Sequence, residues 1–307
     1  MKKAYLLLAL NLFCFTHASF TQTTDKIVSQ IVSEVYGNSQ LETLGHELLD
    51  VIGPRLVGTP QMQQAHDWAL TKYTNWGIAA KNEQWGQWRG WERGITHIDM
   101  VSPRIQTLKG TQLAWSPSTG RKGITAELMV LPTVADSAEF NKWLPSVKGK
   151  MVMISMKEPT GRPDYNWEEF ATPESYDKMK KNREVQENEW SKNMQRIGYN
   201  RLSLPLALEK AGAVGIVSSY WSKGFGANKI FGANTDKIPI IDLELEDYTM
   251  LYRLVEHGNH PKIKILAESK ELGAVPTFNT IAEIKGSEKP DEYVILSAHF
   301  DSWDGGT

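Results

Sequence analysis

The alternation of helical segments with short apolar runs between residues 123 and 267 constrains the fold more than any other feature of the sequence. The expected helices cover residues 204–211 and 246–257, and the expected strands cover residues 151–154, 214–217, 238–241 and 262–267. Glycine often separates a helix from the strand that follows, as Gly212 does. Such alternation is typical of α/β units whose strands are largely parallel. The sequence therefore predicts an α/β fold in which helices flank a sheet.

The amino terminus has the three parts of a secretory signal peptide. Lys2 and Lys3 precede an apolar stretch from Ala4 to Phe15, and Thr16 and Ala18 place small residues at a cleavage site. The apolar stretch is shorter than the roughly 20 residues that a membrane-spanning helix needs. We therefore expect residues 1–18 to be cleaved and the protein to be secreted or periplasmic, with no stable membrane span. A retained anchor is the alternative.

The single cysteine, Cys14, lies inside this segment, and Leu12 and Phe13 before it do not fit a lipidation signal. Removal of residues 1–18 leaves 32 basic and 36 acidic residues, a net charge of −4, and no cysteine. A surface of that charge does not favour nucleic-acid binding. Disulfides and thiolate ligands are excluded, so any metal must be held by His, Asp and Glu.

Helical spacing is also expected for residues 24–52, up to the glycine and proline at positions 53 and 54. Thr59 can cap a following helix whose first turn holds Pro60. His66 and Asp67 in that helix are expected on its solvated face.

Short strands are expected over residues 79–101. Trp85, Trp88 and Trp91 recur there at three-residue spacing beside glycine and arginine. Core packing with cation–π stacking is the favoured interpretation, and a binding surface is the alternative. The charged stretch of residues 167–201 is expected to be a solvated helical insertion.

A candidate metal site follows the last apolar run of the chain. Tyr293–Ala298 has the composition of a strand buried in a parallel sheet, and it leads directly into His299 and Asp301. Ligands of open α/β sheets bind beyond the carboxyl ends of the strands. We expect a ring nitrogen of His299 to bind a metal, while Asp301 fixes the tautomer and tilt of that ring. The alternative is a histidine at a strand end with a capping aspartate.

This segment resembles the first metal motif of the co-catalytic zinc exopeptidases, which include the bacterial leucyl aminopeptidases. The loop Gly53–Thr59 is similar to one near the start of their peptidase domain, and residues 116–265 resemble their protease-associated domain. After the expected signal peptide at 1–18, the resemblance implies peptidase-domain segments at 19–115 and 266–307, and a protease-associated α/β insert at 116–265 that includes the charged stretch 167–201. It also implies an incomplete mixed sheet, because the chain resembles only the amino-terminal part of such an enzyme.

In that family His299 matches a zinc ligand and Asp301 matches the catalytic-site aspartate that orients it. The resemblance implies two zinc ions that activate a water molecule for hydrolysis of a terminal peptide bond in a peptide or dipeptide. The remaining ligands and the general base would lie beyond Thr307, so this chain alone is expected to be inactive. Substrate-binding residues, the end of the peptide that is trimmed and the oligomeric state are not predicted.

Two other classes of protein stay open. A binding or receptor-like protein could keep this architecture without catalysis, and a metal-dependent acyltransferase or cyclase could share the fold. The sequence contains neither a G-x-S-x-G elbow nor a Walker A loop, and Gly224–Gly226 is too incomplete for a dinucleotide loop. His257 and His260 flank Gly258 and Asn259, which favours a turn at a helix end over a zinc site.

Overall fold

A computed structural model describes residues 26–224 and 232–303, so the expected signal peptide lies outside the described residues. The chain divides into two compact units, residues 1–47 and 48–307. The first contains α1 (Lys26–Gly37) and α2 (Leu41–Gly45), and a π-helix (His46–Ile52) begins at its end. The helical prediction for this region is confirmed over the described residues.

The second unit contains an eight-stranded sheet in the order β2-β1-β8-β4-β5-β6-β7-β3. The strands are β1 (Ala79–Ser102), β2 (Gln106–Thr107), β3 (Gly110–Gln112), β4 (Ile124–Val130), β5 (Met151–Met153), β6 (Gly215–Ser218), β7 (Ile240–Leu243) and β8 (Lys262–Glu283). Strands β4 to β7 are parallel to one another, whereas the pairs β1–β2, β1–β8, β8–β4 and β7–β3 are antiparallel. The sheet is therefore mixed, and the predicted α/β class is confirmed.

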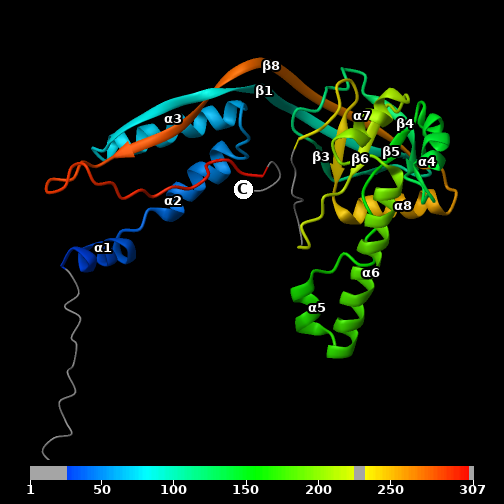
Figure 1. Ribbon diagram of the computed structural model, residues 1–307, viewed down its shortest axis with the longest axis horizontal. Helices are drawn as coiled ribbons and strands as arrows, with labels where there is room; N and C mark the ends of the chain where they lie inside the picture. Colours follow the sequence, from blue (N-terminus) through cyan, green and yellow to red (C-terminus); the bar gives the residue numbers. More distant parts are fainter. Residues whose placement is uncertain (1–25, 225–231, 304–307) are drawn as a thin grey trace, which may run out of the picture. The chain divides into compact units, whose positions relative to one another are not determined.

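Strands β1 and β8 form one long antiparallel ribbon (Figure 1). The sequence predicted several short strands here, and that prediction was wrong because glycines break the apolar pattern without breaking the pairing. The register shifts at Gly86 and Gly90. A Cβ at Gly90 would lie 2.6 Å from Val275 Cγ1, so the two strands approach too closely for a side chain at that position. Strand β8 also continues through the expected domain boundary between residues 265 and 266.

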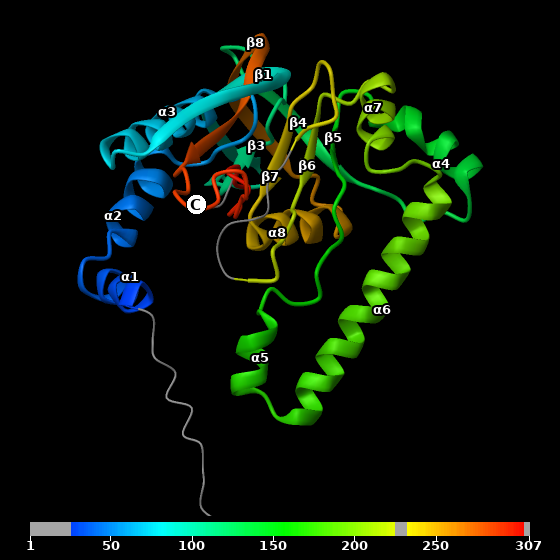
Figure 2. The same cartoon turned by 60° about the vertical axis from the view of Figure 1, so that its left-hand side comes forward.

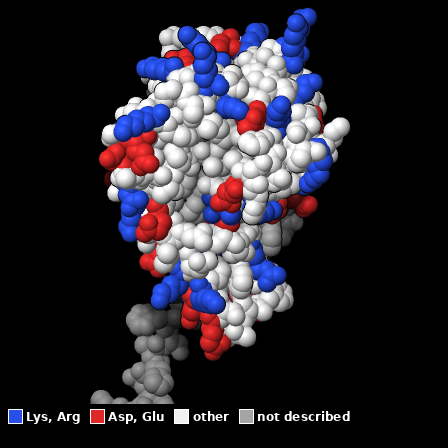
Figure 3. Space-filling model, turned by 90° about the vertical axis from the view of Figure 1, so that its right-hand side faces the viewer, with Lys and Arg blue, Asp and Glu red and all other residues white. Residues whose placement is uncertain are grey.

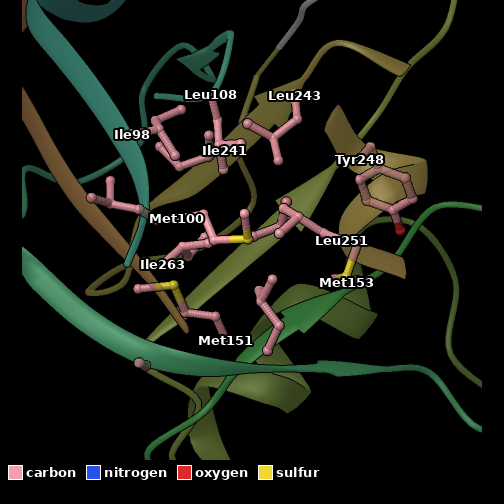
Figure 4. Close-up of a cluster of buried hydrophobic side chains, with 14 of the residues drawn as sticks. Ile98, Met100, Leu108, Met151, Met153, Ile241, Leu243, Tyr248, Leu251 and Ile263 are labelled. Atoms are coloured by element: carbon pink, nitrogen blue, oxygen red, sulfur yellow. The ribbon is translucent and has the colours of Figure 1, made fainter. Parts of the chain in front are cut away.

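Helices cover both faces of the parallel part of the sheet. Residues of α8 (Leu245–Glu256) lie on one face, and residues of α4 (Ser137–Trp143) and α7 (Ser203–Lys210) lie on the other. The other helices are α3 (Pro60–Asn75), which packs against β1 and β8, a 3₁₀ turn (Leu144–Val147), α5 (Asp164–Phe170) and α6 (Pro173–Ile197). Met151 and Met153 pack with Leu251 of α8, as Figure 4 shows. Val152 between them points to the other face, in the cluster that contains Phe140 of α4. This alternation is what a strand with two covered faces requires, and Figure 2 shows α8 apart from α4 and α7.

The charged stretch is helical, as predicted. Thr172 caps α6 through Ser175 N at 3.4 Å, and Gly198 ends the helix with a φ of 80°. Arg183 is buried within it, stacked 5.0 Å from the Trp221 ring centre and hydrogen-bonded to Asp164. Acidic and basic side chains are interspersed over the face of the molecule in Figure 3.

The loop that precedes α3 packs against β1. Leu56 and Trp91 are buried in one cluster, and Trp91 N donates a hydrogen bond to Gly58 O at 3.1 Å. Arg93 lies 5.1 Å from the Trp91 ring centre, so the predicted cation–π packing is confirmed for this tryptophan. Trp85 and Trp88 are instead 57% and 46% exposed. The sequence therefore predicted the packing of one tryptophan in three.

We expect Gly58→Ala to destabilise the protein more than Gly120→Ala. Both glycines have positive φ, of 80° and 70°, and that conformation costs an L-residue about 1–2 kcal/mol. A Cβ at Gly58 would also lie 2.7 Å from Arg89 O, whereas a Cβ at Gly120 would meet nothing within 4 Å. Urea unfolding of both variants measures the difference, and equal losses of free energy of unfolding would contradict the tight packing.

None of the helices in the described residues has the length and apolar composition that crossing a membrane requires.

Candidate metal centre

His299 and Asp301 lie together near the end of the described chain. The His299 Nδ1 atom is 3.0 Å from Asp301 Oδ1 and 2.9 Å from the Asp301 carbonyl oxygen. Both of these oxygens are acceptors, so Nδ1 must carry the hydrogen that it donates. The lone pair of the neutral ring is then on Nε2, and the His299 side chain is 84% exposed. The geometry leaves Nε2 able to bind a metal while Asp301 holds the ring.

The strand that was predicted to carry this pair is absent. Tyr293–Ala298 has no strand conformation, and Val294 and Leu296 are 97% and 96% exposed. An apolar strand of this kind needs a neighbouring strand and cover on both faces. Within the described residues β8 is already paired with β1 and β4, and no strand pairs with residues 293–298. Residues 293–298 have the apolar composition of a buried strand, but a strand also needs a neighbouring strand, and composition does not show whether one is present.

Arg55 holds the segment that contains the pair. Its backbone N donates to Ser302 Oγ at 2.9 Å, and Ser302 N donates back to the Arg55 carbonyl at 2.9 Å. The side-chain Nε donates to the Phe300 carbonyl at 3.1 Å, directly between the two predicted site residues. Burial lowers the pKa of the Arg55 guanidinium, and the nearby Asp301 carboxylate opposes that shift. The sequence singled out the loop of Arg55 only by resemblance and assigned no role to the arginine.

His66 is buried, so its predicted place on a solvated helix face was wrong. Its Nδ1 lies 2.8 Å from Thr280 Oγ1, and that hydroxyl donates to Asn82 Oδ1 at 2.8 Å. Its ring meets the Phe300 ring edge-on, with centres 5.3 Å apart. The sequence did contain a signal, because His66 is four residues after Met62 and one after Ala65, on the same buried stripe of α3. His66 therefore packs directly against the residue between His299 and Asp301.

We expect His66→Gln to remove part of the pH dependence of stability. Burial lowers the pKa of the His66 imidazole below its usual value near 6.5, although Asp67 opposes the shift. The unfolded chain then binds a proton more readily than the folded one, so this contribution to stability is present above about pH 6.5 and is lost as the pH falls through the folded pKa. Urea unfolding between pH 8 and pH 5 should show a smaller loss in the glutamine variant. An equal loss in both proteins would contradict a buried neutral histidine.

A hollow of about 1870 Å³ lies in front of the pair. Thr59 and His66 of the α3 region, Trp88 of β1 and Phe278 of β8 border it together with His299. The volume exceeds that of a usual ligand pocket, because the unpaired run 293–298 forms part of its wall. The predicted metal ligand thus faces an open, largely apolar space.

The described residues contain no group of three or more His, Cys, Asp or Glu side chains placed to hold one metal ion. The pair nevertheless fits zinc chemically, since a neutral imidazole with a carboxylate behind it is a common zinc-ligand arrangement. His257 ends α8, and His260 Nδ1 lies 3.0 Å from Glu127 Oε1, so the turn predicted at these two histidines is confirmed. The described residues therefore contain one candidate ligand, His299, and the aspartate that is hydrogen-bonded to its ring, Asp301.

Comparison with known proteins gives a consistent result. Carboxypeptidase Q of Rattus norvegicus is 27% identical over 294 residues, which cover 94% of this chain and 54% of that protein. Carboxypeptidase Q of Mus musculus is 28% identical over 295 residues, again 94% of this chain and 55% of the relative. The chain is therefore similar, over most of its length, to carboxypeptidase Q proteins. No protein-family model matches it.

A solved structure agrees with this family at the level of fold. The crystal structure of a peptidase M28 precursor from Shewanella amazonensis SB2B superposes with a TM-score of 0.60 at 24% identity, covering 91% of this chain and 58% of that chain. The fold of this chain therefore matches that of a solved peptidase. The chain spans about half the length of the curated relatives that it matches.

Proposed function

We propose that this chain is the amino-terminal part of a secreted zinc exopeptidase that hydrolyses terminal peptide bonds of peptides or dipeptides. One observation carries the proposal: His299 lines an open hollow while its Nδ1 is hydrogen-bonded to Asp301, which leaves Nε2 as the nitrogen able to bind a metal. The similarity to proteins named carboxypeptidase Q supports a peptide substrate. The basic start and apolar core of residues 1–18 support secretion.

The residues of this chain have defined tasks in the proposed reaction. His299 would supply one nitrogen ligand to a two-zinc site, and Asp301 would keep its ring in the Nδ1–H tautomer. Zinc, when bound, polarises the scissile carbonyl and lowers the pKa of a water molecule. Phe278 and Trp88 border the hollow and would contact apolar parts of the substrate. The remaining ligands and the general base would come from chain beyond Thr307.

The proposed function includes a division of the chain into a peptidase domain and an inserted domain. We infer a protease-associated insert at residues 116–265, with the charged helical insertion 167–201 inside it, between peptidase segments 19–115 and 266–307. The four parallel strands β4 to β7 and the helices α4, α7 and α8 support a compact α/β insert. The continuous strand β8 would then link the insert to the peptidase segment.

The complete protein that carries this chain tests the proposed function. Purified protein should contain up to two zinc ions per chain and hydrolyse a dipeptide with two free ends. Parallel assays with an N-acylated and a C-amidated dipeptide identify the end that the enzyme recognises. Zinc-free protein with no hydrolysis of any of the three would favour the alternative, a receptor-like binding protein of the same architecture.

A further inference from the structure

We propose that Arg55 is a positioning residue of the zinc site, which holds the segment 299–302 so that the His299–Asp301 pair is arranged before metal binds. The inference rests on the proposed zinc site and deepens it. It assigns a task to a buried arginine that touches neither the expected metal nor the substrate.

The backbone contacts fix the position of the segment along the loop. Arg55 N and Arg55 O bond Ser302 Oγ and Ser302 N, each at 2.9 Å. Two bonds in opposite directions between the same residues fix both the distance and the register of the two segments. Ser302 directly follows Asp301, so these bonds also fix the backbone position from which the Asp301 side chain extends.

The side chain fixes the middle of the motif. Nε of Arg55 donates to Phe300 O at 3.1 Å, and Nη1 donates to Leu48 O at 3.0 Å and Gly53 O at 2.8 Å. These acceptors are all neutral carbonyls, and no ion pair to Arg55 occurs within the described residues. The guanidinium is a planar, rigid group of donors, so it joins the segment 299–302 to the π-helix through Leu48 and to the following Gly53. Burial lowers the pKa of Arg55, and the Asp301 carboxylate acts on the guanidinium only through its charge, which raises that pKa against the effect of burial.

The loop that contains Arg55 is itself firmly packed. Arg55 is only 5% exposed and its neighbour Leu56 is equally buried. Gly58, three residues later, is bound through its carbonyl to Trp91 N at 3.1 Å. A ligand is held most accurately when its supporting residues have no freedom of their own. The loop of Arg55 meets that condition, whereas residues 293–298 before the motif have no pairing strand among the described residues.

The test uses Arg55→Lys and Arg55→Ala in the complete protein, with Arg253→Lys as the matched control. Arg253 is an exposed arginine in the last turn of α8 and does not line the hollow. Lysine keeps the charge but cannot bond three carbonyls in one plane. We expect both Arg55 variants to bind zinc about 10–100-fold more weakly, as other residues that orient metal ligands do. The control should bind zinc like the parent.

Two further readouts separate positioning from a general loss of folding. The visible absorption bands of the cobalt-substituted protein report the geometry of the metal ligands, and they should shift in the lysine variant. Millimolar guanidinium should partly restore zinc affinity in the alanine variant and leave the control unchanged. Parent-like zinc affinity and cobalt bands in both Arg55 variants would overturn the positioning role alone. A parent protein that binds no zinc would overturn the proposed function, and this inference with it.

Discussion

In the complete protein, His299→Ala is expected to lower kcat/KM for dipeptide hydrolysis by more than about 100-fold, a larger loss than removal of an orienting residue causes. The variant removes the imidazole that lines the hollow and whose Nδ1 lies 3.0 Å from Asp301 Oδ1, so it removes the proposed nitrogen ligand. Because the side chain is 84% exposed, its loss should leave the fold intact. Zinc content and thermal unfolding, measured on the same preparation, distinguish loss of the site from loss of structure.

His257→Ala is the matched control, since His257 is an exposed histidine at the end of α8 and should change neither zinc content nor activity. Asp301→Asn should give an intermediate result, with zinc affinity reduced about 10–100-fold. Undiminished zinc content and activity in the His299 variant would remove that residue from the site. An unchanged zinc affinity in the Asp301 variant would remove only its orienting role.

The second large effect concerns stability. Trp91→Ala is expected to lower the free energy of unfolding by about 3–5 kcal/mol, the usual cost of emptying the space of a large aromatic side chain. Trp91 is 1% exposed, packs with Leu56 and Ala114, and donates from Nε1 to Ser116 O at 3.3 Å. It therefore joins β1, the loop of Arg55 and the segment after β3 in one cluster. Urea denaturation at equilibrium measures the change.

Trp85→Ala provides the comparison within the same strand. Trp85 is 57% exposed, and replacement of such a surface residue should change the free energy of unfolding by no more than about 0.5 kcal/mol. Similar losses in the two alanine variants would show that Trp91 does not anchor the loop.

The sequence predicted those parts of the fold whose signals are local. Thr59 caps α3 as expected, through Met62 N at 3.3 Å, and Gly212 separates α7 from β6. Apolar runs at Met151–Met153 and Gly215–Ser218 became parallel strands because helices cover both of their faces. Helix caps, glycines that end helices and apolar runs can be predicted from a few neighbouring residues.

Pairing over long distances was not readable. The ribbon of β1 and β8 joins residues about 180 positions apart, such as Arg89 and Ala274, and its glycines conceal a continuous strand. Residues 293–298 show the opposite case, since an apolar run predicted a strand for which the described chain has no partner. The contact of Arg55 with Phe300 and Ser302 is likewise set by the tertiary fold alone. The sequence therefore predicted His299 and Asp301 as site residues, but it did not predict the contacts of Arg55 that hold their segment.

Anomalous X-ray diffraction from crystals of the complete protein, recorded on both sides of the zinc absorption edge, tests the central claim most directly. The account predicts a zinc peak about 2.0–2.1 Å from Nε2 of His299, with Nδ1 of the same ring still hydrogen-bonded to Asp301. A zinc peak held entirely by other residues, or an imidazole of His299 turned away from every peak, would contradict it.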